Sequence, residues 1–200
     1  MNGSNFWDER YAAQQHVYGT EPNDFLRTSH SAIPAGPVLS LGEGEGRNAV
    51  FLATKGHEVT AVDSSSVGLR KAAALAAQRG VSLTTVHADL QHYHLGEARW
   101  SGIVSVFVPL PSDLRRSVYR RAVRALAPGG AFVLESYTPA QIGNGTGGGK
   151  DPDTMVTANV LRLELDGLTF EYLEELERDV FEGVFHIGRS AVVQLIARKP

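Results

Sequence analysis

The stretch PVLSLGEGEGRNAVFLATKGHEVTAVD, residues 37–63, decides the fold class of this chain. It opens with PVLSL, an aliphatic run between Pro37 and Gly42 that is typical of a buried strand. The apolar residues after Gly46 favour a helix that ends at Gly56, and HEVTAVD then predicts a second strand. A strand, a glycine-rich turn, a helix and a strand in this order predict a βαβ unit with parallel strands.

The same alternation continues along the chain, and its last part differs. Helices are expected at 64–80 and 111–130, and strands at 81–90, 101–110 and 131–137. A flexible loop with five glycines (143–150) and a helix (154–165) precede two consecutive strands at 168–186 and 189–198. The sequence therefore predicts an α/β fold: a seven-stranded, mostly parallel sheet with helices on both faces and a C-terminal antiparallel hairpin.

Length and composition limit the function classes. The 200 residues suit a single domain, with 1–35 as an N-terminal helical segment covering the site and 36–200 as the core. The chain has no cysteine, which rules out disulfides, thiolate metal sites and cysteine nucleophiles. Its net charge of −3 argues against a non-specific nucleic-acid binder. Because we find neither a signal-peptide pattern nor an apolar run long enough to span a membrane, we expect a cytoplasmic protein.

The glycine-rich turn at 41–48 is the first candidate binding site. Open parallel sheets bind ligands at the carboxyl ends of their strands. Gly42, Gly44 and Gly46 tolerate positive φ and let a ligand approach the backbone closely. The helix that starts at Arg47 offers free N–H groups and the positive end of its dipole, which suits a carboxylate. The Arg47 side chain adds a direct ion pair with the same group.

Two acids follow at the ends of the next two expected strands. Asp63, with Ser64 beside it, ends the second strand, where a carboxylate accepts hydrogen bonds from both hydroxyls of a ribose. Asp89 ends the third strand, where it accepts a hydrogen bond from an adenine amino group while the Leu90 N–H binds a ring nitrogen. Taken singly, these features are also compatible with a tight turn, a helix cap and a loop carboxylate. Together they predict a nucleotide-like ligand.

An NAD(P)-dependent oxidoreductase is the main alternative. GEGEGR has Arg47 where the third glycine of G-x-G-x-x-G belongs, and a shifted match from Gly44 begins later than expected. None of the six tyrosines has a lysine four residues further on, so the Tyr-x-x-x-Lys dyad of one large dehydrogenase class is missing. The glycine turn alone therefore does not decide the ligand.

The motifs taken together resemble those of class I S-adenosylmethionine-dependent methyltransferases. The matching segments are residues 38–63 for the first two motifs, VHADL (86–90) for the adenine contact, VSVFVPLP (104–111) for strand four and LAPGGAFVLESYTPAQ (126–141) for strand five. FWDERY (6–11), VYGTEPNDFL (17–26) and EGVFHIGRSAVVQLIAR (182–198) are similar to the tellurite-resistance TehB-like branch. The resemblance covers essentially the whole chain and implies a Rossmann-like fold with S-adenosylmethionine as cofactor.

The resemblance also implies a donor site. Its expected members are Gly42, Glu43, Gly44, Gly46, Arg47, Asp63, Ser64, Asp89, Leu90 and Phe107, covered by Trp7, Arg10 and Tyr18 of the N-terminal segment. Two positions depart from the family pattern: Ser40 stands where Asp is frequent, and Glu43 where Cys or Asp is frequent. We therefore expect Glu43 or the backbone carbonyl of Phe107 to hold the methionine amino group. The departure at Ser40 keeps open a non-catalytic module that only binds S-adenosylmethionine.

The expected reaction is methyl transfer to a small-molecule acceptor. A soft acceptor such as a thiol or a chalcogen oxyanion needs little help from a base, whereas a hydroxyl needs one, and His186 between the last two strands is the candidate. His92 and His94 are too few ligands for a metal site. FVPLP is not the (N/D)-P-P-(Y/F) motif of base-amino DNA methyltransferases, and the cytosine-C5 type needs a cysteine. Neither nucleic acid nor a membrane is therefore an expected partner.

Overall fold

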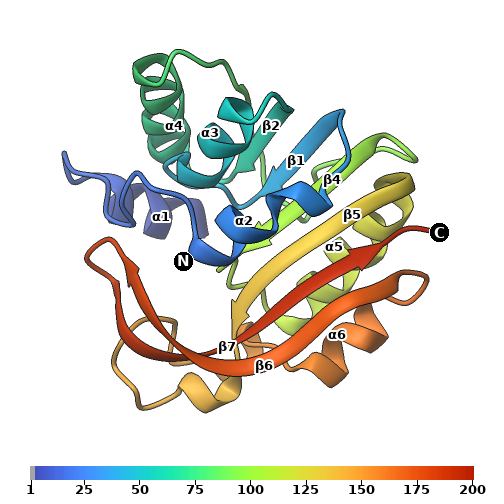
Figure 1. Cartoon of the computed structure of the whole chain (residues 1–200). Coiled ribbons are helices and arrows are strands. Elements are labelled where there is room, and N and C mark those ends of the chain that lie inside the picture. Colours follow the sequence, from blue (N-terminus) through green and yellow to red (C-terminus); the bar gives the residue numbers. More distant parts are fainter. Residues whose placement is uncertain (1–2) are drawn as a thin grey trace.

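The computed structural model describes residues 3–200, so residues 1 and 2 of the expected N-terminal segment lie outside the described part. At its centre is a seven-stranded sheet in the order β3-β2-β1-β4-β5-β7-β6 (Figure 1). Its strands are β1 (Pro37–Leu41), β2 (Glu58–Asp63), β3 (Thr84–His87), β4 (Trp100–Val106), β5 (Leu126–Tyr137), β6 (Thr169–Glu182) and β7 (His186–Arg198). Strands β1 to β5 are parallel, and β7 and β6 complete the sheet as an antiparallel pair. The expected fold class is confirmed.

Helices cover both faces of this sheet (Figure 1). They are α1 (Gly3–Tyr11), α2 (Asp24–Ser29), α3 (Arg47–Thr54), α4 (Ser66–Gln78), α5 (Ser112–Ala125) and α6 (Ala158–Glu164), with short 3-10 helices at His30–Ala32, Pro139–Gln141 and Pro152–Thr154. Among residues 3–200, none of the helices combines the length and the apolar character needed to cross a bilayer.

Alternation along the strands divides the core into two layers. Val38 of β1 packs in one layer with Leu26 of α2 and Leu52 of α3. Its neighbour Leu39 packs in the other layer, which contains Tyr119 of α5. Both strand residues are fully buried, as expected for a parallel sheet covered on both faces.

Close packing explains one of the glycines in the first turn. Gly46 precedes α3 with φ of 96°, in the left-handed region. A Cβ placed there would lie 2.6 Å from Ala72 of α4. Gly46 therefore lets α3 and α4 pack against each other directly.

Several element boundaries differ from the expected ones, and His186, expected between the last two strands, is the first residue of β7. Strand β3 covers only Thr84–His87 of the expected 81–90. Strand β5 begins at Leu126, inside the expected helix, because Leu126 already pairs with Trp100 of β4. Helix α6 begins at Ala158 because the Thr157 side chain accepts a hydrogen bond from Val160 N and caps it.

The hairpin of β6 and β7 is long, and its tip reaches the N-terminal segment (Figure 1). Val184 N donates a 2.9 Å hydrogen bond to the carbonyl of Val17. At Gly183, φ is 69° and a Cβ would lie 2.3 Å from that same carbonyl oxygen. Two segments from distant parts of the chain, the one after α1 and the tip of the β6–β7 hairpin, therefore contact each other.

Candidate functional site

A cavity of about 1040 Å³ opens at the carboxyl ends of the parallel strands. The sheet order reverses between β1 and β4, and such switch points are where open α/β sheets bind ligands. The expected site residues that line the cavity are Trp7, Arg10, Tyr18, Gly42, Glu43, Arg47, Asp63, Ser64, Asp89, Leu90, Phe107 and His186. Sequence reasoning had therefore selected residues that the fold brings together.

Gly44 and Gly46 do not line the cavity, contrary to the expectation that all three turn glycines face a ligand. A Cβ at Gly44 would lie 2.5 Å from the Tyr11 hydroxyl, so this glycine makes room for α1. Gly42 does line the cavity, and a Cβ there would lie 2.7 Å from Val108. Of the three turn glycines, only Gly42 thus offers bare backbone to a ligand.

Asp63 at the end of β2 holds the turn in place. One carboxylate oxygen accepts a 2.8 Å hydrogen bond from Gly44 N, and the other accepts a 2.7 Å bond from Ser65 N. Burial raises the pKa of Asp63, although these two backbone donors act in the opposite direction. The carboxylate therefore fixes the glycine turn relative to the start of α4 and still lines the cavity.

Glu43 has a different role from the expected one. Its carboxylate accepts hydrogen bonds from Asn48 N (3.1 Å) and Ala49 N (3.0 Å) and from the Ser40 hydroxyl. Burial raises its pKa to about 7, against the effect of these donors. The expectation of free N–H groups in the first turn of α3 is therefore wrong for Asn48 and Ala49, which Glu43 caps. The two positions that depart from the family pattern, Ser40 and Glu43, are bonded to each other.

Arg47 is bound by the C-terminal hairpin. Its Nη2 lies 2.6 Å from Glu182 Oε2, and both side chains are buried. Its Nη1 is also buried and has no hydrogen-bond partner in the part of the chain that the structure describes. Arg47 therefore has one nitrogen engaged with Glu182 and one remaining donor beside the cavity.

Asp89 and Leu90 lie on a loop that α5 holds. Asp89 is exposed and accepts a 2.8 Å hydrogen bond from Gln91 N. Arg121 of α5 donates to the carbonyls of Leu90 (2.6 Å) and Tyr93 (2.7 Å). The sequence pattern does not predict this clamp, because Arg121 and the two carbonyls lie far apart in the chain.

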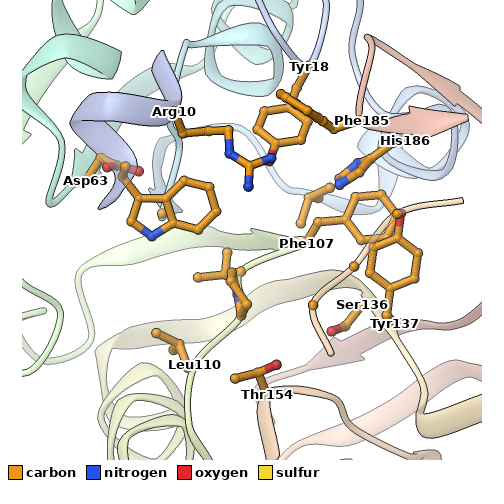
Figure 2. A pocket seen from close by; sticks show the side chains of 18 of the residues that line it. Arg10, Tyr18, Asp63, Phe107, Leu110, Ser136, Tyr137, Thr154, Phe185 and His186 are labelled. Atoms are coloured by element: carbon orange, nitrogen blue, oxygen red, sulfur yellow. The ribbon is translucent and has the colours of Figure 1, made fainter. Parts of the chain in front are cut away.

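Aromatic rings from four distant segments surround the other end of the cavity (Figure 2). Phe107 stacks on Tyr137 with ring centroids 4.5 Å apart, and His186 meets both rings edge-on. Tyr18 lies 4.7 Å from the His186 ring. The guanidinium carbon of Arg10 lies 4.3 Å from the centroid of Phe185. This end is therefore largely aromatic.

Sequence reasoning missed several residues at this aromatic end, among them Ser136, Tyr137, Gln141, Thr154 and Met155. Ser136 and Tyr137 carried a signal, since they end a strand of the parallel sheet as Asp63 does. The others lie after β5, in or next to short 3-10 helices, for which the sequence pattern predicts no position.

His186 is poorly suited to act as a base. Its ring is buried, and Nδ1 has no hydrogen-bond partner among the described residues. Burial, assisted by the positive charge of Arg47, lowers its pKa to about 3. The ring is therefore neutral at neutral pH, but a general base works best with a pKa near the working pH. Within residues 3–200 we also find no group of three or more side chains arranged to hold a metal.

Comparisons with known proteins agree with this geometry. A family model described as a methyltransferase domain matches residues 38–130. A 2-heptyl-1-hydroxyquinolin-4(1H)-one methyltransferase of Mycobacteroides abscessus is 31% identical over 125 residues, which are 61% of this chain and 55% of that protein. The chain spans about half the length of the curated relatives it matches.

Solved structures share the fold over nearly the whole chain. TehB from Haemophilus influenzae superposes with a TM-score of 0.72 at 17% identity, over 98% of this chain and 67% of that one. The N-methyltransferase NodS from Bradyrhizobium japonicum WM9, in complex with S-adenosyl-L-homocysteine, gives a TM-score of 0.73 at 19% identity over all of both chains. Residues 38–130 therefore match a methyltransferase domain, and the chain shares its fold with these solved structures, one of which holds S-adenosyl-L-homocysteine.

Proposed function

We propose that this chain transfers a methyl group from S-adenosylmethionine to a small-molecule acceptor. The observation that carries this proposal is the convergence of Gly42, Asp63 and Asp89 on one cavity, at the ends of three adjacent elements. The cavity lies at the upper end of the roughly 300–1000 Å³ typical of ligand pockets, so it has room for a donor and an acceptor together.

The donor half of the cavity fits the adenosine and the methionine ends of S-adenosylmethionine. We define this half as the part lined by Gly42, Arg47, Asp63, Asp89 and Leu90. Asp63 has lone pairs left to accept from ribose hydroxyls after its two backbone bonds. The exposed carboxylate of Asp89 and the backbone of Leu90 suit adenine. The unpartnered Nη1 of Arg47 supplies a buried donor for the methionine carboxylate.

Three further residues complete the proposed donor site. Glu43 is engaged with Ser40 and the start of α3, so we assign the methionine amino group to the backbone carbonyl of Phe107. Arg10 and Trp7 of α1 cover the donor, and Trp7 stacks on Tyr11 with ring centroids 5.6 Å apart. In this proposal the N-terminal segment acts as a cover that excludes water.

When bound, S-adenosylmethionine supplies a methyl group that is already activated by its positive sulfur. The protein's contribution is then alignment of the nucleophile with the methyl carbon and exclusion of water. Alignment alone supplies on the order of 7–11 kcal/mol in well-oriented reactions. The closely packed aromatic residues Phe107, Tyr137 and His186 suit that role.

The sequence suggested a thiol or a chalcogen oxyanion as the acceptor, and the TehB-like fold is compatible with both. The relative from Mycobacteroides abscessus is named for a hydroxyquinolone, which makes an aromatic hydroxyl a further candidate. All three belong in the first acceptor screen, with selenite and tellurite as the chalcogen members.

Titration calorimetry tests the proposed function. We expect S-adenosylmethionine and S-adenosylhomocysteine to bind with one site per chain, and NAD(P)H not to bind. Binding of NAD(P)H alone would support the oxidoreductase alternative. Donor binding without methyl transfer to any member of a wide acceptor screen would support the non-catalytic module.

A further inference from the structure

The acceptor half of the cavity has no carboxylate in its lining. We define this half as the wall formed by Phe107–Leu110, Ser136–Tyr137, the glycine loop 143–150, Thr154–Met155 and Phe185–His186. The cavity's four lining carboxylates are Glu43, Glu45, Asp63 and Asp89, and all follow β1, β2 or β3 at the donor half. Two of them are already engaged by their neighbours: Glu43 caps α3, and Glu45 pairs with Lys71 at 2.7 Å. The acceptor half therefore offers no carboxylate that could accept a proton from the methyl acceptor.

His186 is the only imidazole in the acceptor half, and its surroundings oppose its protonation. The charged groups that act on it are Arg47, Arg10 and Arg178, with Glu182 as the single acid. The remaining neighbours are the rings of Tyr18, Phe107 and Tyr137. Because no described side chain hydrogen-bonds Nδ1, nothing orients the ring as the partner of a general base does.

The charged side chains that do face the acceptor half are positive. Arg10 points into the cavity from α1 and has no ion pair among the described residues (Figure 2). Lys150 at the end of the glycine loop also lines the cavity. This field favours an anion and disfavours a protonated amine.

The apolar surface of the acceptor half consists of rings and bare backbone. Phe107 and Tyr137 stack, and the glycine loop lies directly against Tyr137. A Cβ at Gly147 would lie 2.4 Å from the Tyr137 hydroxyl, and one at Gly148 would lie 3.0 Å from its ring. Glycine therefore fits best at positions 147 and 148, and the bare backbone there leaves a wall that suits a flat aromatic molecule.

We infer that the acceptor is an aromatic weak acid, and that its own ionised oxygen or sulfur is the nucleophile. This inference rests on the proposed function. The acceptor releases its proton to water before the reaction, so no protein group receives it. A lone pair of the anion forms the bond to the methyl carbon as the carbon–sulfur bond breaks, and that bond's electrons remain on sulfur. Aliphatic alcohols and alkylamines, which are not anionic at neutral pH, are excluded.

A series of acceptors of similar shape and graded acidity tests the inference. Substituted phenols, thiophenols and hydroxyquinolines are suitable, with cyclohexanol and cyclohexylamine as saturated controls. We expect the midpoint of the pH–kcat/KM profile to follow the acceptor's own pKa from one member to the next. One common midpoint for all members would reveal a protein base and overturn the inference, as would methylation of the saturated controls.

Binding provides a readout without turnover. In the complex with S-adenosylhomocysteine, we expect 4-nitrophenol to bind as its coloured anion, with a lower pKa than in free solution. Arg10→Met should weaken binding of this anion at pH 8 by about tenfold, since one unit of pKa corresponds to that factor. Arg27→Met, in an exposed pair with Asp24 on α2, is the matched control and should leave it unchanged. Binding of the neutral phenol, or of no aromatic acid at all, would overturn the inference.

A variant of His186 separates its packing from base catalysis. His186→Gln should lower kcat through lost ring contacts but leave the midpoint of the pH profile unchanged. A shifted midpoint, or recovery of activity by added imidazole, would contradict the inference. The proposed function fails separately, since it requires only that S-adenosylhomocysteine binds, which calorimetry measures without an acceptor.

Discussion

The two halves of the cavity are built in different ways. The donor half comes from three short turns that follow consecutive strands of the parallel sheet, so its residues lie close together in the sequence. The acceptor half comes from the ends of β4 and β5, the glycine loop, Thr154–Met155 and the hairpin tip, with α1 covering the cavity, and these segments lie far apart in the chain. The donor half is therefore fixed by the sheet itself, whereas the acceptor half depends on contacts between distant segments.

A buried polar network joins these distant segments to the sheet. Glu135 of β5 is fully buried and accepts hydrogen bonds from Arg178 of β6 (2.6 and 2.7 Å) and from Gln194 of β7 (2.7 Å). Asn23, before α2, donates to both Glu135 and Glu182. Through Glu182 the network reaches Arg47 and thus the donor half.

The largest expected effect concerns the donor half. Asp63→Ala removes two hydrogen bonds that fix the glycine turn, as well as the proposed ribose contact. Bonds to a carboxylate contribute about 1.5–3 kcal/mol each, so affinity for S-adenosylhomocysteine should fall by more than about 100-fold in calorimetry. Asp166→Ala, in an exposed turn, is the control. Unchanged affinity would show that the ribose assignment is wrong.

The connection between the halves is tested next. Glu182→Gln leaves Arg47 buried beside a neutral partner. Breaking a buried ion pair by removing one charge costs about 3 kcal/mol, which corresponds to a decrease in Tm of roughly 10 °C for a chain of this size. Glu177→Gln, on the same strand in an exposed pair with Arg189, should have little effect on Tm. Equal thermal stability of the two variants would contradict a structural role for the network.

The Glu43 cap predicts a pH dependence of stability. Its folded pKa of about 7 lies above the ordinary value of 4.5, so folding favours the protonated form. The contribution of Glu43 to stability is therefore complete below about pH 4.5 and is lost as the pH rises through 7. Glu43→Gln should remove up to about 3 kcal/mol of the difference between urea unfolding at pH 5 and pH 8. An unaltered difference, or the same change in the exposed control Glu97→Gln, would contradict this account.

The smallest expected effect concerns Arg121. Arg121→Met releases the loop that presents Asp89 and Leu90, but the loop keeps its contacts with the core. Two hydrogen bonds of about 1 kcal/mol each predict donor binding weakened by roughly 5- to 30-fold. Arg120→Met, on the exposed face of the same helix, should bind the donor normally. If both variants bind alike, the Arg121 clamp does not position the loop for the donor.

The same difference between the halves explains what the sequence predicts. Periodicity and turn glycines identify strands, and the ends of parallel strands converge. The sequence alone therefore predicts that Gly42, Asp63 and Asp89 lie at one site. Met155 reaches the cavity only through the path of the chain after β5, which has no periodic pattern. The Arg47–Glu182 pair spans 135 positions of the chain, and no local rule predicts such a partner. The cap by Glu43 was missed because a carboxylate in a glycine turn also suits a ligand.

A crystal structure of the complex with S-adenosylhomocysteine tests whether the cavity is divided into a donor half and an acceptor half. We expect the adenosine beside Asp63 and Asp89, the methionine carboxylate at Arg47 Nη1, and the sulfur facing the open space beside Phe107 and His186. A ligand bound elsewhere, or one whose sulfur faces away from the acceptor half, would contradict the division of the cavity into these two halves.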